Sequence, residues 1–412
     1  MTPLTIRIID GRDPRAVNRL LARDAGAGRA FDRRVRAIVD GVRHGGDRAL
    51  MRFARRFDRV APPLEVGLDE MREQAARVPA DVRRAIHRAA GHIARVAFAQ
   101  IPKHFDLAIV PGVLVEQRVE PLARVGCYVP GGRFPLPSSL LMTAVPARVA
   151  GVREIVAVCP RPEPAVMAAA LEAGVTRLFR VGGAHAIAAL AYGTRTIPRV
   201  DKIVGPGNRW VAAAKAAVAA DCAIDFLAGP TEIVIVAGSG RASWIAADLA
   251  AQAEHDPDAR AVLITWNSAL AERVARHGAI ANASIVVTRD AREAMALANR
   301  IAPEHLVVDR EALTRRSLTA GAVFVGPFTA QAAGDYATGS NHVLPTGGAA
   351  RFHGGLSAAD FVRVMSVQRL TRAGLARLAP IILPLARAEG LAGHARSIEI
   401  RLDRPSAINH QP

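Results

Sequence analysis

The stretch Arg177–Tyr192, which reads RLFRVGGAHAIAALAY, decides the fold class. A short apolar run, Arg177–Val181, ends at two glycines and leads directly into the Ala-rich segment Ala186–Tyr192. This order predicts a buried strand, a tight turn and a helix, which together form the repeating unit of a parallel sheet. The same order recurs after Gln100, and the other expected strands are Arg124–Val129, Glu154–Cys159, Lys202–Val204, Glu232–Ala237, Ala261–Thr265, Ser284–Thr288 and Ala322–Val325.

The expected strands are too many for a single sheet. We therefore expect an α/β fold with two Rossmann-like domains, whose parallel sheets are interleaved in sequence, and small helical segments at both ends. Apolar residues at helical spacing predict helices through Asp13–Gln100. Near the other end we expect helices over Ala358–Met365 and Leu375–Arg387, the second broken or kinked by its two prolines, and a disordered tail after Asp403.

The net charge is the largest oddity of the composition. The chain has 412 residues, with 54 Lys+Arg against 37 Asp+Glu, so the net charge is 54 − 37 = +17. Such a balance raises a nucleic-acid hypothesis. However, lysine occurs only at positions 103, 202 and 215, the basic residues are dispersed, and aromatics make up only 4%. Dispersed arginine indicates a general compositional bias, so we expect no nucleic-acid partner.

Several classes of protein are not supported by the sequence. No apolar run reaches the ~18 residues of a membrane-spanning helix, so we expect no membrane partner. The first residues lack the basic and then apolar pattern of a secretion signal. The cysteines, Cys127, Cys159 and Cys222, are far apart and odd in number, which favours neither a disulfide framework nor a thiolate zinc site. A reducing, cytoplasmic location is the simplest expectation.

Three glycine-rich loops follow expected strands and open helices: Gly126–Gly132, Val181–His185 and Val204–Asn208. Glycine allows a tight turn there, and the N–H groups at a helix N-terminus favour anions such as a dinucleotide pyrophosphate. None of the loops is a true G-x-G-x-x-G fingerprint. They can equally be the turns that every strand–helix unit requires.

Three further segments concentrate polar chemistry. Along the helix expected at Trp244–His255, Asp248, Gln252 and His255 share one face, which suits a divalent cation or simply water. Glu304 and His305 are adjacent and could form a general base pair, or could lie in a surface turn. The polar segment 334–346 is longer than a simple connection needs.

Taken together, these motifs identify the chain as similar to histidinol dehydrogenases, over residues ~25–400. The matching segments are Tyr128–Gly132, Leu136–Ser139, Val181–Ala184, Asp201–Asn208, Ala228–Pro230, Gln252–His255, Ala302–Leu306, Gly334–Tyr336 and Asn341–Thr346. The resemblance implies NAD-dependent, zinc-requiring oxidation of L-histidinol to L-histidine through histidinal, in two hydride transfers.

The resemblance also implies roles for individual residues. Those that would hold Zn²⁺ are Gln252, His255, Asp335 and His394. His305 would be the general base, and Glu304 would activate the water that attacks the aldehyde. NAD would contact Tyr128, His185 and Asn208. The small-molecule substrate would contact Thr231, His342, Glu389, His305 and the four zinc ligands.

By the same resemblance, the chain forms a homodimer in which the C-terminal segment completes the partner's site, so Glu389 and His394 would serve the other subunit. The expected division has an N-terminal segment (1–24), a discontinuous zinc-binding and catalytic domain (25–127 and 232–352), an NAD-binding domain (128–231) and a C-terminal helical dimerisation segment (353–412).

Three departures from the family pattern leave an alternative open. His185 stands where Gln is usual, Thr231 stands where many members have Ser, and the stretch Ala269–Ser284 is shortened. A paralogue that oxidises another small hydroxylated substrate, such as a sulfopropanediol, would use the same machinery. An inactive, basic nucleic-acid-binding paralogue is a more remote alternative, and it predicts broken catalytic motifs.

Overall fold

The computed structural model describes residues 6–22, 28–131, 135–227, 229–255, 258–278, 280 and 282–403, without the side chain of His255. Two compact units emerge: one contains Met1–Gln100 and Leu122–Phe361, and the other contains Ile101–Pro121 and Val362–Pro412. The disorder expected after Asp403 lies outside the described residues. Among these residues, no helix combines the length and the apolarity needed to cross a membrane.

The first unit holds two six-stranded sheets. In sheet order, one consists of β2 (Glu65–Val66), β7 (Arg177–Phe179), β6 (Glu154–Val158), β5 (Arg124–Tyr128), β8 (Lys202–Val204) and β9 (Ala223–Ile224). All its pairings are parallel except β2 with β7. Its helices are α2 (Arg29–Phe53), η1 (Ala54–Asp58), α3 (Leu68–Ala76), α4 (Ala80–Ala99), α5 (Pro137–Val149), α6 (Pro164–Ala173), α7 (Gly183–Tyr192) and α8 (Arg209–Val218).

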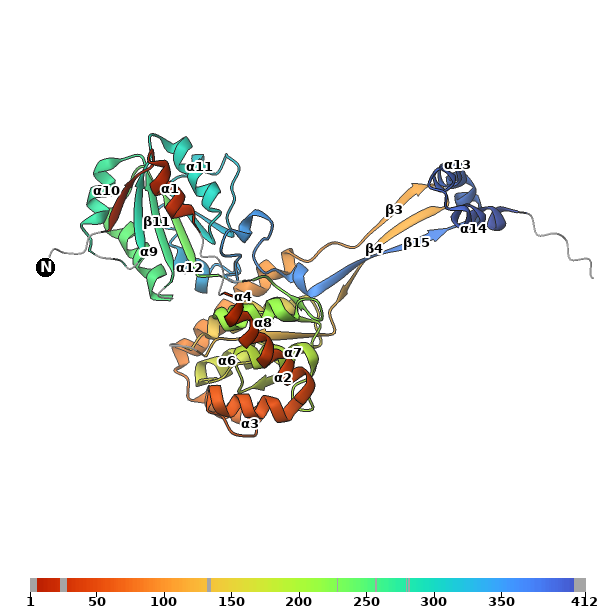
Figure 1. Cartoon of the computed structure of the whole chain (residues 1–412), viewed down its shortest axis with the longest axis horizontal. Helices are drawn as coiled ribbons and strands as arrows, with labels where there is room; N and C mark the ends of the chain where they lie inside the picture. The colour runs from red at the N-terminus through yellow and green to blue at the C-terminus, as the bar shows by residue number, and fades with distance from the viewer. Residues whose placement is uncertain are drawn as a thin grey trace, which may run out of the picture. The chain divides into compact units, whose positions relative to one another are not determined.

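Alternating side chains place an apolar core on each face of this sheet. Along β6, Ile155 and Ala157 pack with α3 to α6, whereas Val156 and Val158 pack with α2, α7 and α8. Helices therefore cover both faces, as Figure 1 shows. Burial on both faces explains why these strands are continuous Val/Ile/Ala runs rather than half-polar ones.

The second sheet is entirely parallel. In sheet order, its strands are β1 (Arg7–Asp10), β12 (Ala283–Val287), β11 (Arg260–Thr265), β10 (Glu232–Val236), β13 (His305–Val308) and β14 (Ala322–Val325). Helices α9 (Ala242–His255) and α10 (Ser268–Ala275) pack on one face, and α1 (Pro14–Leu21) and α11 (Ala291–Ile301) pack on the other. The short elements after β13 are η2 (Glu311–Leu313), α12 (Gln331–Tyr336), η3 (Ala349–Arg351) and η4 (Ala358–Phe361).

Both sheets share one doubly wound topology. Once β1 and β2 are set aside, the strand order in each is third, second, first, fourth, fifth. The order reverses between β5 and β8 in one sheet and between β10 and β13 in the other. The expected pair of Rossmann-like domains is therefore confirmed, and each sheet has a switch point of the type that binds ligands.

The second unit is a three-stranded antiparallel sheet with two helices. Its strands are β3 (Phe105–Val110), β4 (Val113–Pro121) and β15 (Val362–Leu370), followed by α13 (Arg372–Ala388) and α14 (Ala392–Leu402). The helix expected over Ala358–Met365 is wrong beyond η4, because Val362–Leu370 pairs along its whole length with β4. The expected helix over Leu375–Arg387 forms, and α13 runs through both of its prolines without ending.

The observed division differs from the expected domains. Helices α2 to α4 pack on the sheet of β5 to β9, rather than with residues 232–352. Strand β1, from the expected N-terminal segment, joins the other sheet by pairing with β12. Helical periodicity predicts which face of a helix is buried, but it carries no information about which sheet covers that face.

Candidate active site

A cluster of polar side chains lies where β10 and β13 begin. Glu304 Oε2 accepts a hydrogen bond from Thr231 Oγ1 at 2.5 Å and one from Glu232 N at 3.0 Å. The parallel pairing of β10 with β13 sets His305 opposite Ile233, one residue further along. The adjacent Glu304–His305 pair is thus brought to the amino end of the sheet by strand register, not by a surface turn.

Glu304 sits in an environment that favours its neutral form. The residue is buried, and burial is the main cause that raises the pKa of its carboxyl from 4.5 to about 8. The negative charges of Glu232 and Asp335 raise this pKa further, whereas the hydrogen bonds from Thr231 and Glu232 N lower it. The carboxyl therefore exchanges its proton near neutral pH, which is what a catalytic acid or base requires.

The ring of His305 is held in one tautomer. Its Nδ1 lies 3.2 Å from the carbonyl oxygen of Glu232, and a carbonyl can only accept, so Nδ1–H is the donor. Its Nε2 lies 3.4 Å from Nε2 of Gln331, which as an amide nitrogen can only donate. His305 Nε2 is therefore a lone-pair acceptor, and it lies 4.0 Å from Oδ1 of Asp335.

The same hydrogen-bonded network continues through three further elements. Gln252 on α9 donates from Nε2 to Thr231 Oγ1 at 2.5 Å. On α12, Gln331 donates to Asp335 Oδ2 at 2.6 Å, one helical turn away. His342 donates from Nδ1 to the backbone carbonyl of Asp335 at 3.0 Å. Three segments distant in sequence thus converge on the start of β13.

The side-chain oxygen of Gln252 is a buried polar atom in this network that needs a partner. Gln252 is fully buried, and among the described residues its Oε1 has no hydrogen-bond partner. A buried acceptor without a donor is costly, and a cation is the other group that can satisfy it. The carboxylate of Asp335 stands on α12, which packs against α9. An amide oxygen and a carboxylate on contacting helices are the oxygen part of a divalent-cation donor set, so these residues fit a metal.

The NAD-contact candidates lie on the other sheet. Tyr128 ends β5, and its hydroxyl accepts from Gly183 N at 3.1 Å. His185 is buried, and its Nε2 donates to Asp58 Oδ2 at 2.8 Å. The same Asp58 oxygen accepts from Gly182 N at 3.0 Å. Asp58 and Tyr128 therefore accept hydrogen bonds from the N–H groups of Gly182 and Gly183 at the start of α7, the groups that the loop pattern offered to a pyrophosphate.

Asn208 has a different environment. It is exposed and caps α8, because its Oδ1 accepts from the N–H groups of Trp210 and Val211 at 3.0 and 3.3 Å. With Oδ1 engaged, the side-chain NH₂ is the group that Asn208 can offer to a ligand. It stands at the carboxyl end of β8, beside the switch point between β5 and β8.

Comparisons with known proteins decide the family. A family model described as histidinol dehydrogenase matches residues 21–402. The chain is 46% identical to the histidinol dehydrogenase of Geobacter sulfurreducens, covering 93% of this chain and 96% of that protein. It is 44% identical to that of Gluconobacter oxydans, covering 93% and 96%. The chain belongs to the histidinol dehydrogenase family.

The three-dimensional comparison agrees. The crystal structure of histidinol dehydrogenase from Elizabethkingia anophelis matches with a TM-score of 0.91 and 30% identity, covering 96% of this chain and 98% of that one. The resemblance stated from the motifs is thus confirmed, and the chain is an oxidoreductase of histidine biosynthesis. In this histidinol dehydrogenase family member, the polar cluster lies at the amino end of the sheet that contains β10 and β13. The residues predicted to contact NAD lie at the carboxyl end of the sheet that contains β5 and β8.

Not every expected site residue enters this cluster. Thr231, Gln252, Glu304, His305, Asp335 and His342 share the network. The side chain of His255 lies outside the described residues. Glu389 and His394 are exposed and belong to the other compact unit, so their roles stay predictions. Among the described residues, no group of three or more His, Cys, Asp or Glu side chains could by itself hold a metal.

Sequence reasoning missed four residues that shape these sites: Asp58, Glu232, Gln331 and Ser139. Ser139, on α5, lies 3.4 Å from Nε2 of His342 through its Oγ. The spacing of Gln331 and Asp335, four residues apart on a short helix, was the one available signal. The partners of Asp58 and Glu232 are contacts across more than 70 positions of sequence, which no local pattern predicts.

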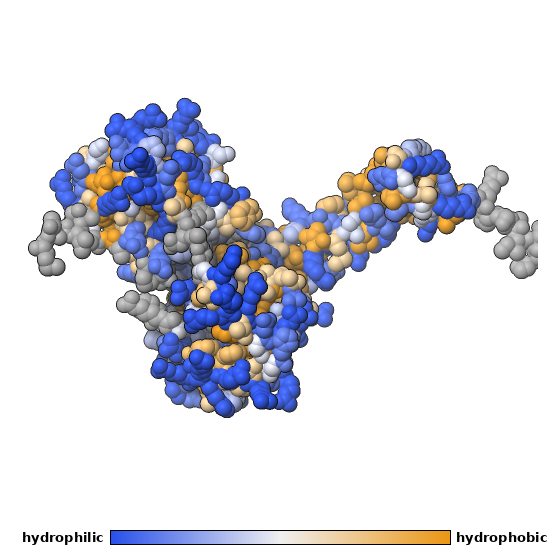
Figure 2. Space-filling model, viewed as in Figure 1, coloured by the Kyte–Doolittle hydropathy of each residue, from blue (hydrophilic) through white to orange (hydrophobic). Residues whose placement is uncertain are grey.

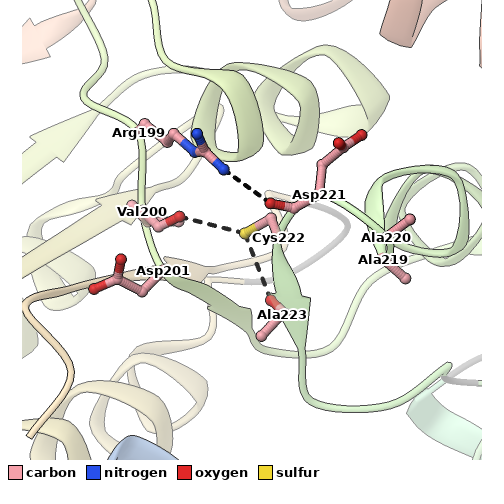
Figure 3. A pocket seen from close by; sticks show the side chains of 8 residues that line it. All are labelled: Arg199, Val200, Asp201, Ala219, Ala220, Asp221, Cys222 and Ala223. Carbon is pink, nitrogen blue, oxygen red and sulfur yellow. Dashed lines mark hydrogen bonds between the residues drawn. The ribbon is translucent and has the colours of Figure 1, made fainter. Parts of the chain in front are cut away.

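The three cysteines play no visible chemical part. All are buried, and burial raises the pKa of Cys222 to about 11. Figure 3 shows Cys222 lining a pocket of about 350 Å³ with Arg199 and Asp221, and its thiol donates to the carbonyl of Val200. A protonated thiol is a poor nucleophile, so these cysteines are not candidate catalytic nucleophiles.

Proposed function

We propose that this chain oxidises L-histidinol to L-histidine through histidinal, with two hydrides transferred to NAD⁺ and with Zn²⁺ in the site. The observation that carries the proposal is the single hydrogen-bonded network that joins Thr231, Gln252, Glu304 and His305 to Asp335. In balance, one alcohol, one water and two NAD⁺ give one carboxylate, two NADH and three protons.

His305 would serve as the general base of the alcohol step. Its Nε2 carries the lone pair, because Nδ1–H is committed to the carbonyl of Glu232. The base accepts the carbinol proton while hydride leaves the carbon. A base already oriented by its neighbours loses little freedom when the substrate binds, which supports this assignment.

Glu304 would accept a proton from the water that adds to histidinal. With a pKa of about 8, its carboxyl changes between acid and base forms at little cost near neutral pH. Thr231 donates to the carboxyl oxygen and accepts from Gln252, so it links the base to the metal side of the site. This position also suits Thr231 for contact with substrate.

Gln252 and Asp335 would hold the zinc ion, together with His255 and with His394 of a second copy. When bound, the ion would supply positive charge that anchors the imidazole and amino nitrogens of the substrate. The orphaned Oε1 of Gln252 is the structural support for this part of the proposal. NAD⁺ would approach Asn208 at the switch point, while Tyr128 and His185 shape the turn before α7.

The decisive experiment follows NADH with L-histidinol and purified, zinc-loaded protein. Two NADH per histidinol, lost in His305→Ala and on chelation, would support the proposal. No turnover with histidinol, but turnover with a sulfopropanediol, would replace it with the paralogue hypothesis.

We further propose that the protein is a homodimer whose C-terminal segment reaches the partner's site. The second unit exposes apolar side chains, including Phe105, Leu107 and Ile109 on β3 and Ile381 and Leu385 on α13. Figure 2 shows hydrophobic residues on the visible face of this unit. Apolar patches of this kind are typical of protein interfaces.

Subunit mixing tests the shared site. His305→Ala and His394→Ala should each be inactive alone. In a randomly reassociated mixture, heterodimers would hold one intact site, so about a quarter of wild-type activity should return. If light scattering shows a monomer, or if no activity returns on mixing, the shared-site proposal fails.

A further inference from the structure

Lys215 and Asp225 form an ion pair buried in the NAD-side lobe, by which we mean the sheet of β5 to β9 and the helices packed on it. Lys215 Nζ lies 2.7 Å from Asp225 Oδ1, and the two side chains are 3% and 1% exposed. Lys215 lies on α8 among buried apolar residues such as Val211 and Ala214. It is one of three lysines in a chain whose other basic residues are arginine. Neither residue belongs to the polar network at β10 and β13.

The pair holds both polar groups of one peptide residue. Gly205 N donates to Asp225 Oδ2 at 2.8 Å, and Lys215 Nζ donates to the carbonyl of Gly205 at 2.6 Å. Asp225 Oδ1 also accepts from Phe226 N at 2.7 Å. Both charges of the pair therefore fix backbone next to β8.

Gly205 packs directly against the backbone at the end of β5. Its φ is +114°, and a Cβ there would lie 2.2 Å from the carbonyl oxygen of Tyr128. The turn after β8 is thus pressed against the end of β5, at the switch point. Three residues later, Asn208 caps α8 and faces solvent.

Stability alone does not account for this pair. Removing two charges from water is expensive, and apolar residues of similar volume are often equally or more stabilising. What apolar residues lack is the ability to donate to and accept from Gly205. The pair therefore has a geometric role that packing cannot replace.

We propose that Lys215 and Asp225 are positioning residues for the cofactor: they hold the Gly205–Asn208 turn where NAD⁺ binds, without touching NAD⁺ themselves. The proposal rests on the proposed use of NAD⁺. The pair acts on binding geometry, so its loss should weaken NAD⁺ binding and leave the chemistry at Glu304 and His305 unchanged.

The test separates positioning from stability. Lys215→Met leaves a buried carboxylate unpaired and should lower the melting temperature. The double variant Lys215→Met with Asp225→Leu removes both charges, so it should be more stable than Lys215→Met, although Gly205 loses both of its partners. In the zinc-loaded double variant, the Kd for NAD⁺ by calorimetry should still rise on the order of tenfold. The kcat at saturating NAD⁺ and the KM for histidinol should stay within about twofold of wild type.

A matched control is Lys202→Met, which removes another lysine–aspartate pair of the same lobe, to Asp360, without touching Gly205. Its NAD⁺ affinity should equal that of wild type. Gly205→Ala displaces the turn while the ion pair remains, and it should weaken NAD⁺ binding as the double variant does. This second route keeps the test open if the double variant does not fold.

Two results would overturn the proposal: a folded double variant that binds NAD⁺ as wild type does, or a Gly205→Ala variant with unchanged affinity. Failure of the wild-type protein to bind NAD⁺ at all would instead refute the proposed function. The outcomes are therefore distinguishable.

Discussion

Replacing Glu304 with Gln should make the metal-free protein more stable at neutral pH. Glu304 is buried, and its pKa is raised from 4.5 to about 8, mainly by burial. Its Oε2 accepts from Thr231 and from Glu232 N, and the amide oxygen of a glutamine side chain can accept both bonds. The substitution thus removes a titrating charge while keeping the hydrogen bonds.

Proton linkage gives the direction in which the stability of the wild-type protein changes with pH. Between the unfolded and folded pKa values, the folded state keeps a proton that the unfolded state releases. Wild-type stability therefore falls as pH rises, by about 1.4 kcal/mol per pH unit for one proton. From about pH 5.5 to about pH 7.5, the loss is about 2.5 kcal/mol, whereas the neutral side chain of the Glu304→Gln variant avoids it.

Urea unfolding of chelator-treated protein at these two pH values measures the effect. The stability advantage of Glu304→Gln over wild type should grow by about 2.5 kcal/mol at the higher pH. Glu65→Gln is the control. The hydrogen bond from Arg177 lowers the pKa of Glu65, so that carboxyl is largely ionised in both the folded and the unfolded state at both pH values. The difference in unfolding free energy between Glu65→Gln and wild type should therefore be the same at both pH values. A Glu304→Gln advantage that stays flat or shrinks with pH would refute the reasoning.

Further predictions concern the base, the metal and the thiols. His305→Ala should lower kcat by about 10²–10⁴-fold in stopped-flow assays while NAD⁺ still binds. Gln331→Leu removes a donor to a proposed metal ligand, so competition with a chelator should show zinc affinity reduced by about 10–100-fold; unchanged affinity would exclude that role. Chelation should abolish NADH formation, and one equivalent of Zn²⁺ should restore it. Iodoacetamide near pH 8 should leave Cys127, Cys159 and Cys222 unmodified by mass spectrometry, because burial raises their pKa values to about 12, 11 and 11.

Local pattern was sufficient where the physics is local. Apolar runs bounded by glycine predicted β5, β6, β8 and β10, because a strand buried on both faces must be apolar throughout. The same patterns failed at Val362–Leu370, where polar residues interrupt the apolar ones and no glycine bounds the segment. That strand exists because β4 supplies its hydrogen bonds, a partner more than 240 residues away.

The sequence by itself determined the fold class and the family, since these depend on residue types and their order along the chain, and the resemblance to that family implied the candidate catalytic residues. Only the tertiary structure decided that α2 to α4 cover the sheet of β5 to β9, that Glu304 is buried against Thr231, and that Lys215 reaches Asp225. Burial and hydrogen bonding depend on which distant segments meet. For this reason the sequence alone could not predict the raised pKa of Glu304, the tautomer of His305 or the geometry of the turn at Gly205.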